Sequence, residues 1–491
     1  MTKNFKISDG LPLVTLAGTG AAIAIGIGIK MTVTLVEKHR KHKDALGDKH
    51  EDRISLLSDD LLSDIMSRLN VIEAVRTRIL SRRWRNIFLS NSRLHFDCNM
   101  FGSIQHNHKS RHCCQHKFKF IKAVDQCLKR FSGQSINYFG LKCCLGKEFA
   151  PNFNRWMKSI ASFGVQELMV KFCSPSEFPF QLLFEVASLK HLQLASCTLQ
   201  RSFKGQFKSL QFLYLDAVPL DKGEFTSILS SCMNLQGITV AHCKLPQKLS
   251  ISGHCLQLRS VLIQSCSGVL EIEIRHGNLS AFCCYTDKMM RYSLPFAPKL
   301  DLLCINFNAR YTLPYFFFEV AKGCAGLKKL LIQTKTDELK CTVFASMLSN
   351  LRVLYLLTVL NTKADPLNVG RILALCPLLE HFRLLARGRV GNEPRAAKSS
   401  AVAATEHHAH LKLIELEGFR GTRNDIELAS YMLRSAPALE RLSLFTSYTC
   451  FLPDFSWTEH KDYVMDNEQR QLIYKELEGQ AISSKAKVVI S

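Results

Sequence analysis

An apolar pattern of the form Leu-x-x-Leu-x-Leu recurs twelve times along the chain and constrains its fold more than any other feature. Other apolar residues sometimes replace leucine, and successive copies start 21 to 32 residues apart. The last two apolar residues of each copy are two apart, which places them on one face of a short strand. No single segment of strand plus helix can bury such a face, so the segments must stack into a solenoid. The twelve copies, called anchors below, are Val165/Leu168/Val170, Leu189/Leu192/Leu194, Leu210/Leu213/Leu215, Leu235/Ile238/Val240, Leu258/Val261/Ile263, Leu279/Phe282/Cys284, Leu300/Leu303/Ile305, Leu327/Leu330/Ile332, Leu351/Leu354/Leu356, Leu379/Phe382/Leu384, Leu411/Ile414/Leu416 and Leu439/Leu442/Leu444.

The alternative is an α/β domain with chance spacing, but twelve anchors in one phase favour the solenoid. The segment "LALCPLLEHFRLL" (373–385) has a proline, Pro377, that stops a helix before Leu379 starts the next strand. It resembles a repeat ending in the long, irregular leucine-rich repeats of plants. The resemblance implies an α/β fold of short strand plus helix per repeat, which we assign to residues 119–385.

The C-terminal part resumes the pattern after residues 386–409, which are low in large apolar residues and are predicted to form a loop. Residues 410–444 read as strand, glycine-containing turn, helix and strand. The predicted helix has its N-cap at Asn424 and Asp425. Its apolar face is formed by Leu428, Tyr431 and Met432, and Pro437 stops it. This stretch and the closing "LEGQAISSKAKVVIS" are similar to the FBD module of plant F-box proteins, which would occupy residues 410–491.

A different pattern precedes the repeats, in "DRISLLSDDLLSDIMSRLNVIEAVRTRILSRRWRNIF" (52–88). Four apolar residues recur every four positions and, with Leu62 beside them, predict one face of an amphipathic helix: Leu57, Leu61, Ile65 and Leu69. Asp59 and Asp60 suit the first turn of that helix. Two more short apolar groups follow, around Val75 and Trp84. Three short helices within about 40 residues cannot bury all this apolar surface by themselves, so another chain is expected to cover part of it.

The stretch from Asp52 to Asp97 resembles an F-box, through "DRISLLSDDLLSDIMSRL", "AVRTRILSRRWRNIF" and "LHFD". In that family the helices dock on a Skp-type adaptor, which bridges to a cullin so that a bound protein target is ubiquitinated. The resemblance places four residues in the adaptor interface and four that support or extend it: Leu57, Asp60, Leu61 and Leu62, and Ile65, Val75, Leu80 and Trp84.

One position departs from the family, since Ser58 stands where proline is usual. Proline presets a first helical turn, whereas serine can still cap a helix, so we expect binding to weaken by well under about 2 kcal/mol. The alternative for the whole stretch is an ordinary helical subdomain that packs on the repeats.

The N-terminus carries "LPLVTLAGTGAAIAIGIGI" (11–29), nineteen residues without a charge, which can just span a bilayer. A basic cluster at residues 38–43 would keep the following chain on the cytosolic side. We expect residues 1–36 to form an apolar segment and residues 37–51 a charged linker. A single-pass anchor, a signal peptide, a nonspecific apolar extension and a gene-model artefact remain open. The localisation is accordingly the nucleus or cytoplasm, or a membrane with the F-box and repeats in the cytosol.

The charge and cysteine content of the chain indicate which partners and which compartment it can have. The net charge is +22, but Lys and Arg are scattered, so a basic surface without a nucleic-acid partner is predicted. The 19 cysteines mostly sit singly in apolar runs, as Cys197, Cys232, Cys304 and Cys376 do, which indicates a reducing compartment with few or no disulfides.

The histidine- and cysteine-rich segment 106–116 lacks the two separated ligand pairs of a structural zinc site and is read as a polar loop. The sequence has no P-loop, G-x-S-x-G or H-E-x-x-H motif. We therefore expect no catalytic residue, cofactor or metal, and a non-catalytic receptor subunit. The alternative is a leucine-rich-repeat scaffold outside any ligase, with a degenerate F-box and with or without a membrane anchor.

Overall fold

The structure is a computed structural model of the 491-residue chain. It describes residues 54, 56–69, 71–77, 79–90, 92–101, 117–131, 135–144, 149–178, 180–184, 186–199, 205–252, 255–286, 290–307, 312–334, 347–358, 366–386, 407–451, 457–460 and 463–491. The chain divides into two compact units, the first made of residues 1–219 and 223–237 and the second of residues 220–222 and 238–491.

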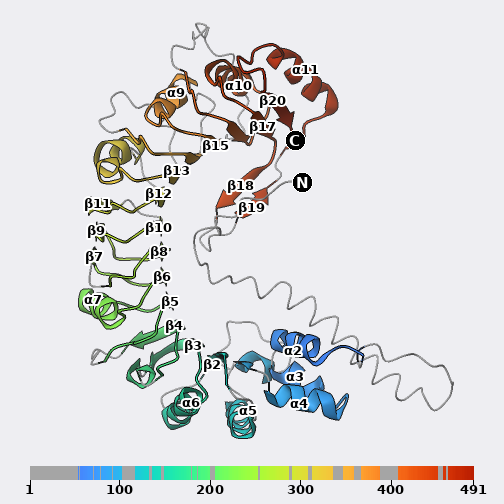
Figure 1. The fold of residues 1–491 in the computed structure, drawn as a ribbon, viewed down its shortest axis with the longest axis vertical. Helices are drawn as coiled ribbons and strands as arrows, with labels where there is room; N and C mark the ends of the chain where they lie inside the picture. Colours follow the sequence, from blue (N-terminus) through green and yellow to red (C-terminus); the bar gives the residue numbers. More distant parts are fainter. Residues whose placement is uncertain are drawn as a thin grey trace, which may run out of the picture. The chain divides into compact units, whose positions relative to one another are not determined.

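The first unit starts with three short helices and continues as a ladder of parallel strands in the order β1-β2-β3-β4-β5 (Figure 1). The three helices are α2 (Asp59–Arg68), α3 (Val71–Thr77) and α4 (Arg82–Ser90). The strands are β1 (Arg93–Asp97), β2 (Tyr138–Cys143), β3 (Glu167–Phe178), β4 (His191–Leu199) and β5 (Phe212–Asp216). The connecting helices are η2 (Cys98–Phe101), α5 (Lys117–Arg130), α6 (Ala150–Ser162), η4 (Phe180–Leu183) and α7 (Lys222–Ser231).

The second unit holds the later part of the ladder, in the order β6-β8-β10-β12-β13-β14-β15-β16-β17-β20. These strands are β6 (Gly237–Ala241), β8 (Ser260–Gln264), β10 (Ala281–Tyr285), β12 (Leu302–Phe307), β13 (Lys329–Thr334), β14 (Val353–Thr358), β15 (His381–Ala386), β16 (Leu413–Glu417), β17 (Arg441–Phe445) and β20 (Lys487–Ile490). Its helices are α8 (Thr312–Tyr315), η5 (Phe316–Val320), η6 (Ala321–Gly323), α9 (Pro366–Ala374), α10 (Arg423–Ser435) and α11 (Asn467–Leu477), and β18 (Tyr448–Phe451) pairs antiparallel with β19 (Trp457–His460).

All twelve predicted anchors lie in or immediately before ladder strands, and none of their residues is more than 4% exposed. The register aligns equivalent anchor residues, so that Leu354 pairs with Phe382 and Phe382 pairs with Ile414. Each row of anchors therefore forms one continuous stripe of the core within its unit. The leucine-rich-repeat fold predicted from the spacing is confirmed.

The array begins one repeat earlier than the sequence pattern suggested. Ile136, Phe139 and Leu141 have the same spacing and are all fully buried in or before β2. Phe139 pairs with Leu168 on one side and with Leu94 of β1 on the other. Isoleucine and phenylalanine at the first two positions hid this anchor, although both fill a buried strand site as well as leucine does.

The return segments between β6 and β12 correct the expectation of one helix per repeat. Here the chain forms three further strands, β7 (Lys248–Ser252), β9 (Glu271–Arg275) and β11 (Arg291–Phe296), which make a side sheet (Figure 1). Only 21 to 23 residues separate the anchors in this region, which leaves little room for a helix and two loops. The residues also alternate between buried and exposed, as in "KLSIS" and "EIEIR", and this period of two favours strands.

The N-cap of α10 lies two residues before Asn424, the first residue of the predicted cap. Its N-cap is Thr422, whose side chain accepts a hydrogen bond from the Asp425 amide at 3.3 Å, while Asp425 accepts one from the Thr422 amide at 3.1 Å. Asp425 thus occupies the third position of a capping box rather than the cap itself. The predicted apolar face is confirmed, because Leu428, Tyr431 and Met432 are buried.

Three predicted segments lie outside the described residues: the apolar stretch 11–29, the polar loop 106–116 and most of the loop 386–409. Among the residues that the structure does describe, no helix has the length and apolar character needed to cross a bilayer. No disulfide joins the fifteen cysteines whose side chains the structure describes. Cys197, Cys232, Cys304 and Cys376 are buried, as predicted for cysteines that act as small apolar residues.

A recurring backbone corner follows the anchors of four repeats. Two residues after the last anchor residue, the chain adopts a left-handed conformation without glycine, at Ser196, Ala217, His242 and Ser265, with φ of 55°, 52°, 50° and 47°. This conformation costs an L-residue about 1–2 kcal/mol because Cβ approaches a backbone carbonyl.

The Ala217→Gly variant should therefore be more stable than the natural chain by about 0.5–1 kcal/mol, since glycine relieves the strain and Ala217 is exposed. Urea denaturation followed by circular dichroism measures the difference. The matched control is Ala241→Gly, at a buried strand position without positive φ, which should lose stability. Equal losses in both variants would show that the corner at Ala217 stores no strain.

Candidate protein-docking site

The three N-terminal helices form a small core of their own. Its residues on α2 are Leu62, Met66 and Leu69, which are 0–5% exposed. Ala74, Trp84 and Ile87 of the next two helices are likewise buried. The inner face of α2 is therefore not the predicted stripe Leu57/Leu61/Ile65/Leu69. Residues four apart drift around a helix with 3.6 residues per turn, so Leu61 and Ile65 lie away from the side that holds Leu69.

The start of α2 is fixed by side-chain contacts in the absence of the usual proline. Ser58 is the N-cap, and its hydroxyl accepts a hydrogen bond from the Leu61 amide at 3.3 Å. Arg83 of α4 donates from Nε to Asp59 Oδ1 at 2.5 Å and from Nη2 to the Leu57 carbonyl oxygen at 2.5 Å. The prediction that serine can cap this helix is confirmed, and Arg83 ties its first turn to α4.

Large apolar side chains nevertheless remain exposed on this module. Leu56 is 77% exposed, Ile79 58% and Leu61 53%, and Val75 and Ile54 are also exposed. These five make up nearly a third of the seventeen exposed large apolar residues in the described part of the chain, although they fall within 26 consecutive positions. Such a concentration on a small helical module is typical of a protein-interaction surface.

The structure sorts the predicted interface residues into two groups. Asp60, Leu61 and Val75 are exposed, and Leu57, Ile65 and Leu80 are half-buried, so these six can contact a partner. Leu62 and Trp84 instead lie in the core of the module and support the surface from beneath.

Besides Ile54, two exposed residues of this module were not among the predicted interface residues, Leu56 and Ile79. Leu56 precedes α2 and Ile79 follows α3, so neither belongs to a helical stripe. The only sequence feature that could have indicated their exposure is that each is a large apolar residue immediately beside a helix end. We define the docking surface as Leu56, Leu57, Leu61, Ile65, Val75 and Ile79.

A second candidate surface lies on the open side of the ladder in the second unit. The Arg383 guanidinium on β15 is 5.6 Å from the centre of the Tyr355 ring on β14. Its Nε donates to Glu417 on β16 at 2.6 Å, and Glu415, two residues earlier on the same face of that strand, lies 3.5 Å from the same atom. Adjacent strands thus present an aromatic ring, a cation and carboxylates side by side.

The neighbours of Glu415 favour its charged form. Burial raises the pKa of Glu415, but His381 and the positive charge of Arg383 outweigh that effect and lower the pKa overall. Glu417 is only 3% exposed and is compensated by its contact with Arg383. We call Tyr355, His381, Arg383, Glu415 and Glu417 the polar face.

Two family models match this chain. Residues 54–96 match the family model of the F-box domain. Residues 127–475, which are more than two thirds of the chain, match the model described as "At1g61320/AtMIF1, LRR domain".

Several proteins of Arabidopsis thaliana are similar to this chain. The "F-box/FBD/LRR-repeat protein At5g56420" is 30% identical over 40% of this chain and 44% of its own length. The "Putative F-box/LRR-repeat protein At3g58880" is 30% identical over 39% of this chain and 42% of its own length. The chain thus spans less than half the length of these two relatives. The "F-box protein At3g59000" is 23% identical over 80% of this chain and 86% of its own length.

Among solved structures, the crystal structure of a TLR13–ssRNA13 complex aligns with a TM-score of 0.36 and 12% identity over 77% of this chain and 56% of that one.

Proposed function

Since the chain belongs to the F-box/leucine-rich-repeat proteins, we propose that it is the target-recognition subunit of a cullin-based (SCF-type) ubiquitin ligase. The observation that carries the proposal is the docking surface itself. Six apolar residues stay fully or half exposed on a module of three short helices whose core is already complete. Removing them from water by binding a Skp-type adaptor would contribute roughly 25 cal/mol for each Å² buried.

The polar face is the part of the repeats that we assign to the protein target. Large target-binding surfaces in repeat proteins are formed by the stacked strands and the loops beside them. Tyr355 and Arg383 belong to the residue types that contribute most at protein interfaces, and Glu415 offers a carboxylate to a basic target.

No catalytic step is assigned to this chain, because in the proposed complex the ubiquitin transfer belongs to its partners. Residues 410–491, with β16, α10, β17, α11 and β20, are proposed as an FBD module that closes the ladder. We propose residence in the nucleus or cytoplasm. A membrane anchor at residues 11–36 remains the alternative and would keep the docking surface in the cytosol.

The alternative function is an interaction scaffold outside any ligase, and Ser58 in place of proline is the observation that favours it. The formed cap at Ser58 and the Arg83 contacts weigh against it, because they build the first turn of α2 without proline.

Co-purification of the full chain with a plant Skp-type adaptor and a cullin tests the proposal. We expect a ternary complex to elute as one peak in size-exclusion chromatography, with the cullin present only when the adaptor is added. A folded chain that leaves the adaptor unbound at micromolar concentration would favour the scaffold instead.

A further inference from the structure

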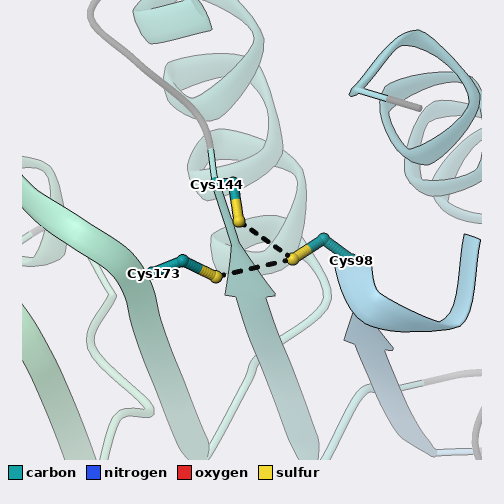
Figure 2. A group of neighbouring side chains, drawn as sticks. All are labelled: Cys98, Cys144 and Cys173. Atoms are coloured by element: carbon teal, nitrogen blue, oxygen red, sulfur yellow. Dashed lines mark hydrogen bonds between the residues drawn. The ribbon is translucent and has the colours of Figure 1, made fainter. Parts of the chain in front are cut away.

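Three cysteines from distant parts of the sequence meet at the carboxyl ends of neighbouring strands in the first unit. Cys98 follows β1 directly, Cys144 follows β2 directly, and Cys173 lies within β3 (Figure 2). The Cys98 Sγ is 3.4 Å from the Cys144 Sγ and 3.6 Å from the Cys173 Sγ. All three sulfur atoms lie within 4.8 Å of one another.

Part of this arrangement follows from the repeat itself. In leucine-rich repeats the position eight residues after the first anchor residue takes asparagine or cysteine. Cys144 and Cys173 hold that position in the first two repeats, as Cys243 and Cys266 do later. The later pair is buried, and each thiol donates to a backbone carbonyl, Cys243 to Ala241 at 3.1 Å and Cys266 to Val240 at 3.4 Å.

The early repeats depart from that arrangement. The pairing of β3 with β4 shifts between Lys171 and Ser176, and Cys173 within this irregularity is exposed. Irregularities of this kind redirect side chains at the edges of functional sites. Cys98 holds no such repeat position, yet its sulfur is in contact with both others. The cluster therefore is more than a continuation of the buried cysteine positions.

The distances suit a metal centre. With a metal–sulfur bond of about 2.3 Å, two thiolates on a tetrahedral zinc ion are about 3.8 Å apart. The two shorter separations here, 3.4 and 3.6 Å, reach that value after movements of a few tenths of an ångström. We propose that Cys98, Cys144 and Cys173 bind one thiophilic metal ion, Zn²⁺ in the first instance, with a fourth position open to water or another ligand.

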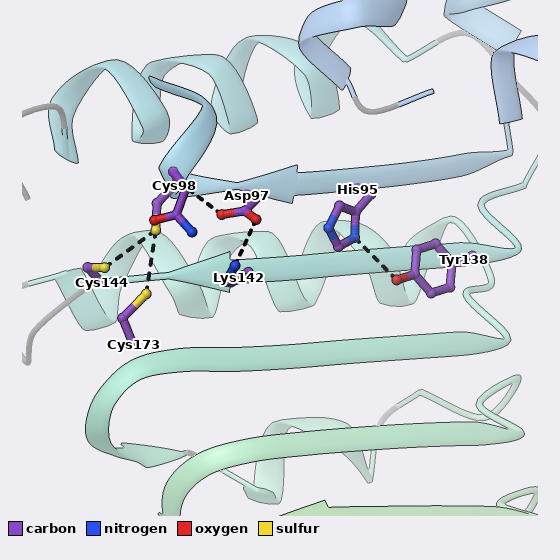
Figure 3. Close-up of polar contacts among 8 residues, drawn as sticks. His95, Asp97, Cys98, Tyr138, Lys142, Cys144 and Cys173 are labelled. Atoms are coloured by element: carbon purple, nitrogen blue, oxygen red, sulfur yellow. Dashed lines mark hydrogen bonds and ion pairs between the residues drawn. The ribbon is translucent and has the colours of Figure 1, made fainter. Parts of the chain in front are cut away.

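An ion pair lies beside the proposed metal centre. A divalent ion with three thiolates carries one net negative charge. The Lys142 ammonium lies beside the cluster and donates to Asp97 Oδ2 at 3.0 Å (Figure 3). Lys142 thus places a positive charge near this negative charge, balanced in part by its own ion pair with Asp97.

The ion would join two parts of the molecule with different tasks. The F-box match ends at residue 96, just before Cys98, whereas Cys144 and Cys173 belong to the first two repeats. Closing loops of 46 and 75 residues at one point removes much of the freedom of the unfolded chain. The metal would therefore clamp the docking module to the repeats, and it takes no part in the docking surface itself.

Metal content of the purified full chain tests this inference. Protein produced with added zinc and kept reduced should contain about one zinc ion per chain by inductively coupled plasma mass spectrometry. Cys98→Ser and Cys173→Ser should each reduce the content to near zero, whereas Cys127→Ser, a half-buried cysteine on α5 outside the cluster, should leave it unchanged. With Co²⁺ in place of zinc, the thiolate-to-metal charge-transfer absorption should fall in the same two variants only.

Circular dichroism shows whether a variant that has lost zinc is still folded. Cys173 is exposed, so Cys173→Ser should retain the native spectrum. Wild-type protein without stoichiometric zinc would overturn the proposal. So would zinc that persists in Cys98→Ser but disappears when His112, Cys113 and Cys114 are replaced, or a Cys98–Cys144 disulfide that survives reductant.

Discussion

Replacing Leu61 with aspartate should weaken adaptor binding by at least about 100-fold, which corresponds to about 3 kcal/mol. Leu61 is 53% exposed on the outer side of α2, so the free chain should tolerate a carboxylate there. Binding would force that carboxylate into an apolar interface, where an unpaired charge is heavily penalised. Isothermal titration calorimetry with the purified adaptor measures the loss.

The matched control is Leu472→Asp on α11, because Leu472 is an equally exposed helical leucine at 62% and lies far from the docking surface in sequence. It should bind the adaptor as the natural chain does. Similar affinity for Leu61→Asp and the natural chain would contradict the docking surface. Leu62 is unsuitable for this test, since it is fully buried and an aspartate there would disrupt the core of the module.

Replacing Phe139 with alanine should lower the stability of the first unit by about 3–5 kcal/mol. Phe139 is fully buried in β2 between Leu94 and Leu168, and its ring centre lies 5.8 Å from that of Phe96. The cavity would therefore loosen the helical module and the first repeats together. Urea unfolding followed by circular dichroism measures the change.

Phe212→Ala provides the control, because Phe212 on β5 is only half-buried and stacks on His191 with ring centres 5.0 Å apart. Its loss should cost about 1 kcal/mol or less. If both variants lost the same amount, the first repeat would not begin at Ile136 as the structure indicates.

The predicted features that the structure confirms rest on local rules repeated many times. A single anchor such as Leu351/Leu354/Leu356 is weak evidence for a fold. A solenoid, however, needs every repeat to present the same buried stripe, so the regular recurrence of the anchors identified the fold. The apolar face of α10 was equally predictable, because Leu428, Tyr431 and Met432 follow helical spacing beside a proline stop.

The features that sequence reasoning missed depend on how elements pack. A spacing of four residues suited Leu57, Leu61, Ile65 and Leu69, but only the packing of α2 against α4 decides that Met66 faces inward and Leu61 outward. The cysteine cluster was hidden for a different reason. Cys98, Cys144 and Cys173 are 46 and 29 residues apart along the chain, and they meet only because their strands are parallel neighbours.

The side sheet β7-β9-β11 has a mechanical consequence within the second unit (Figure 1). Where both the ladder element and the return element of a repeat are strands, successive repeats are about 4.8 Å apart on both sides of the solenoid. Where the return element is a helix, as with α9 and α10, neighbouring helices are about 8–10 Å apart, so the ladder must bend away from the helical side. The stretch from β8 to β12 should therefore be nearly straight, whereas the stretch from β14 to β17, which carries Arg383 and Glu415, should curve around whatever it holds. A target with a convex surface would meet the second stretch at several points and the first at few.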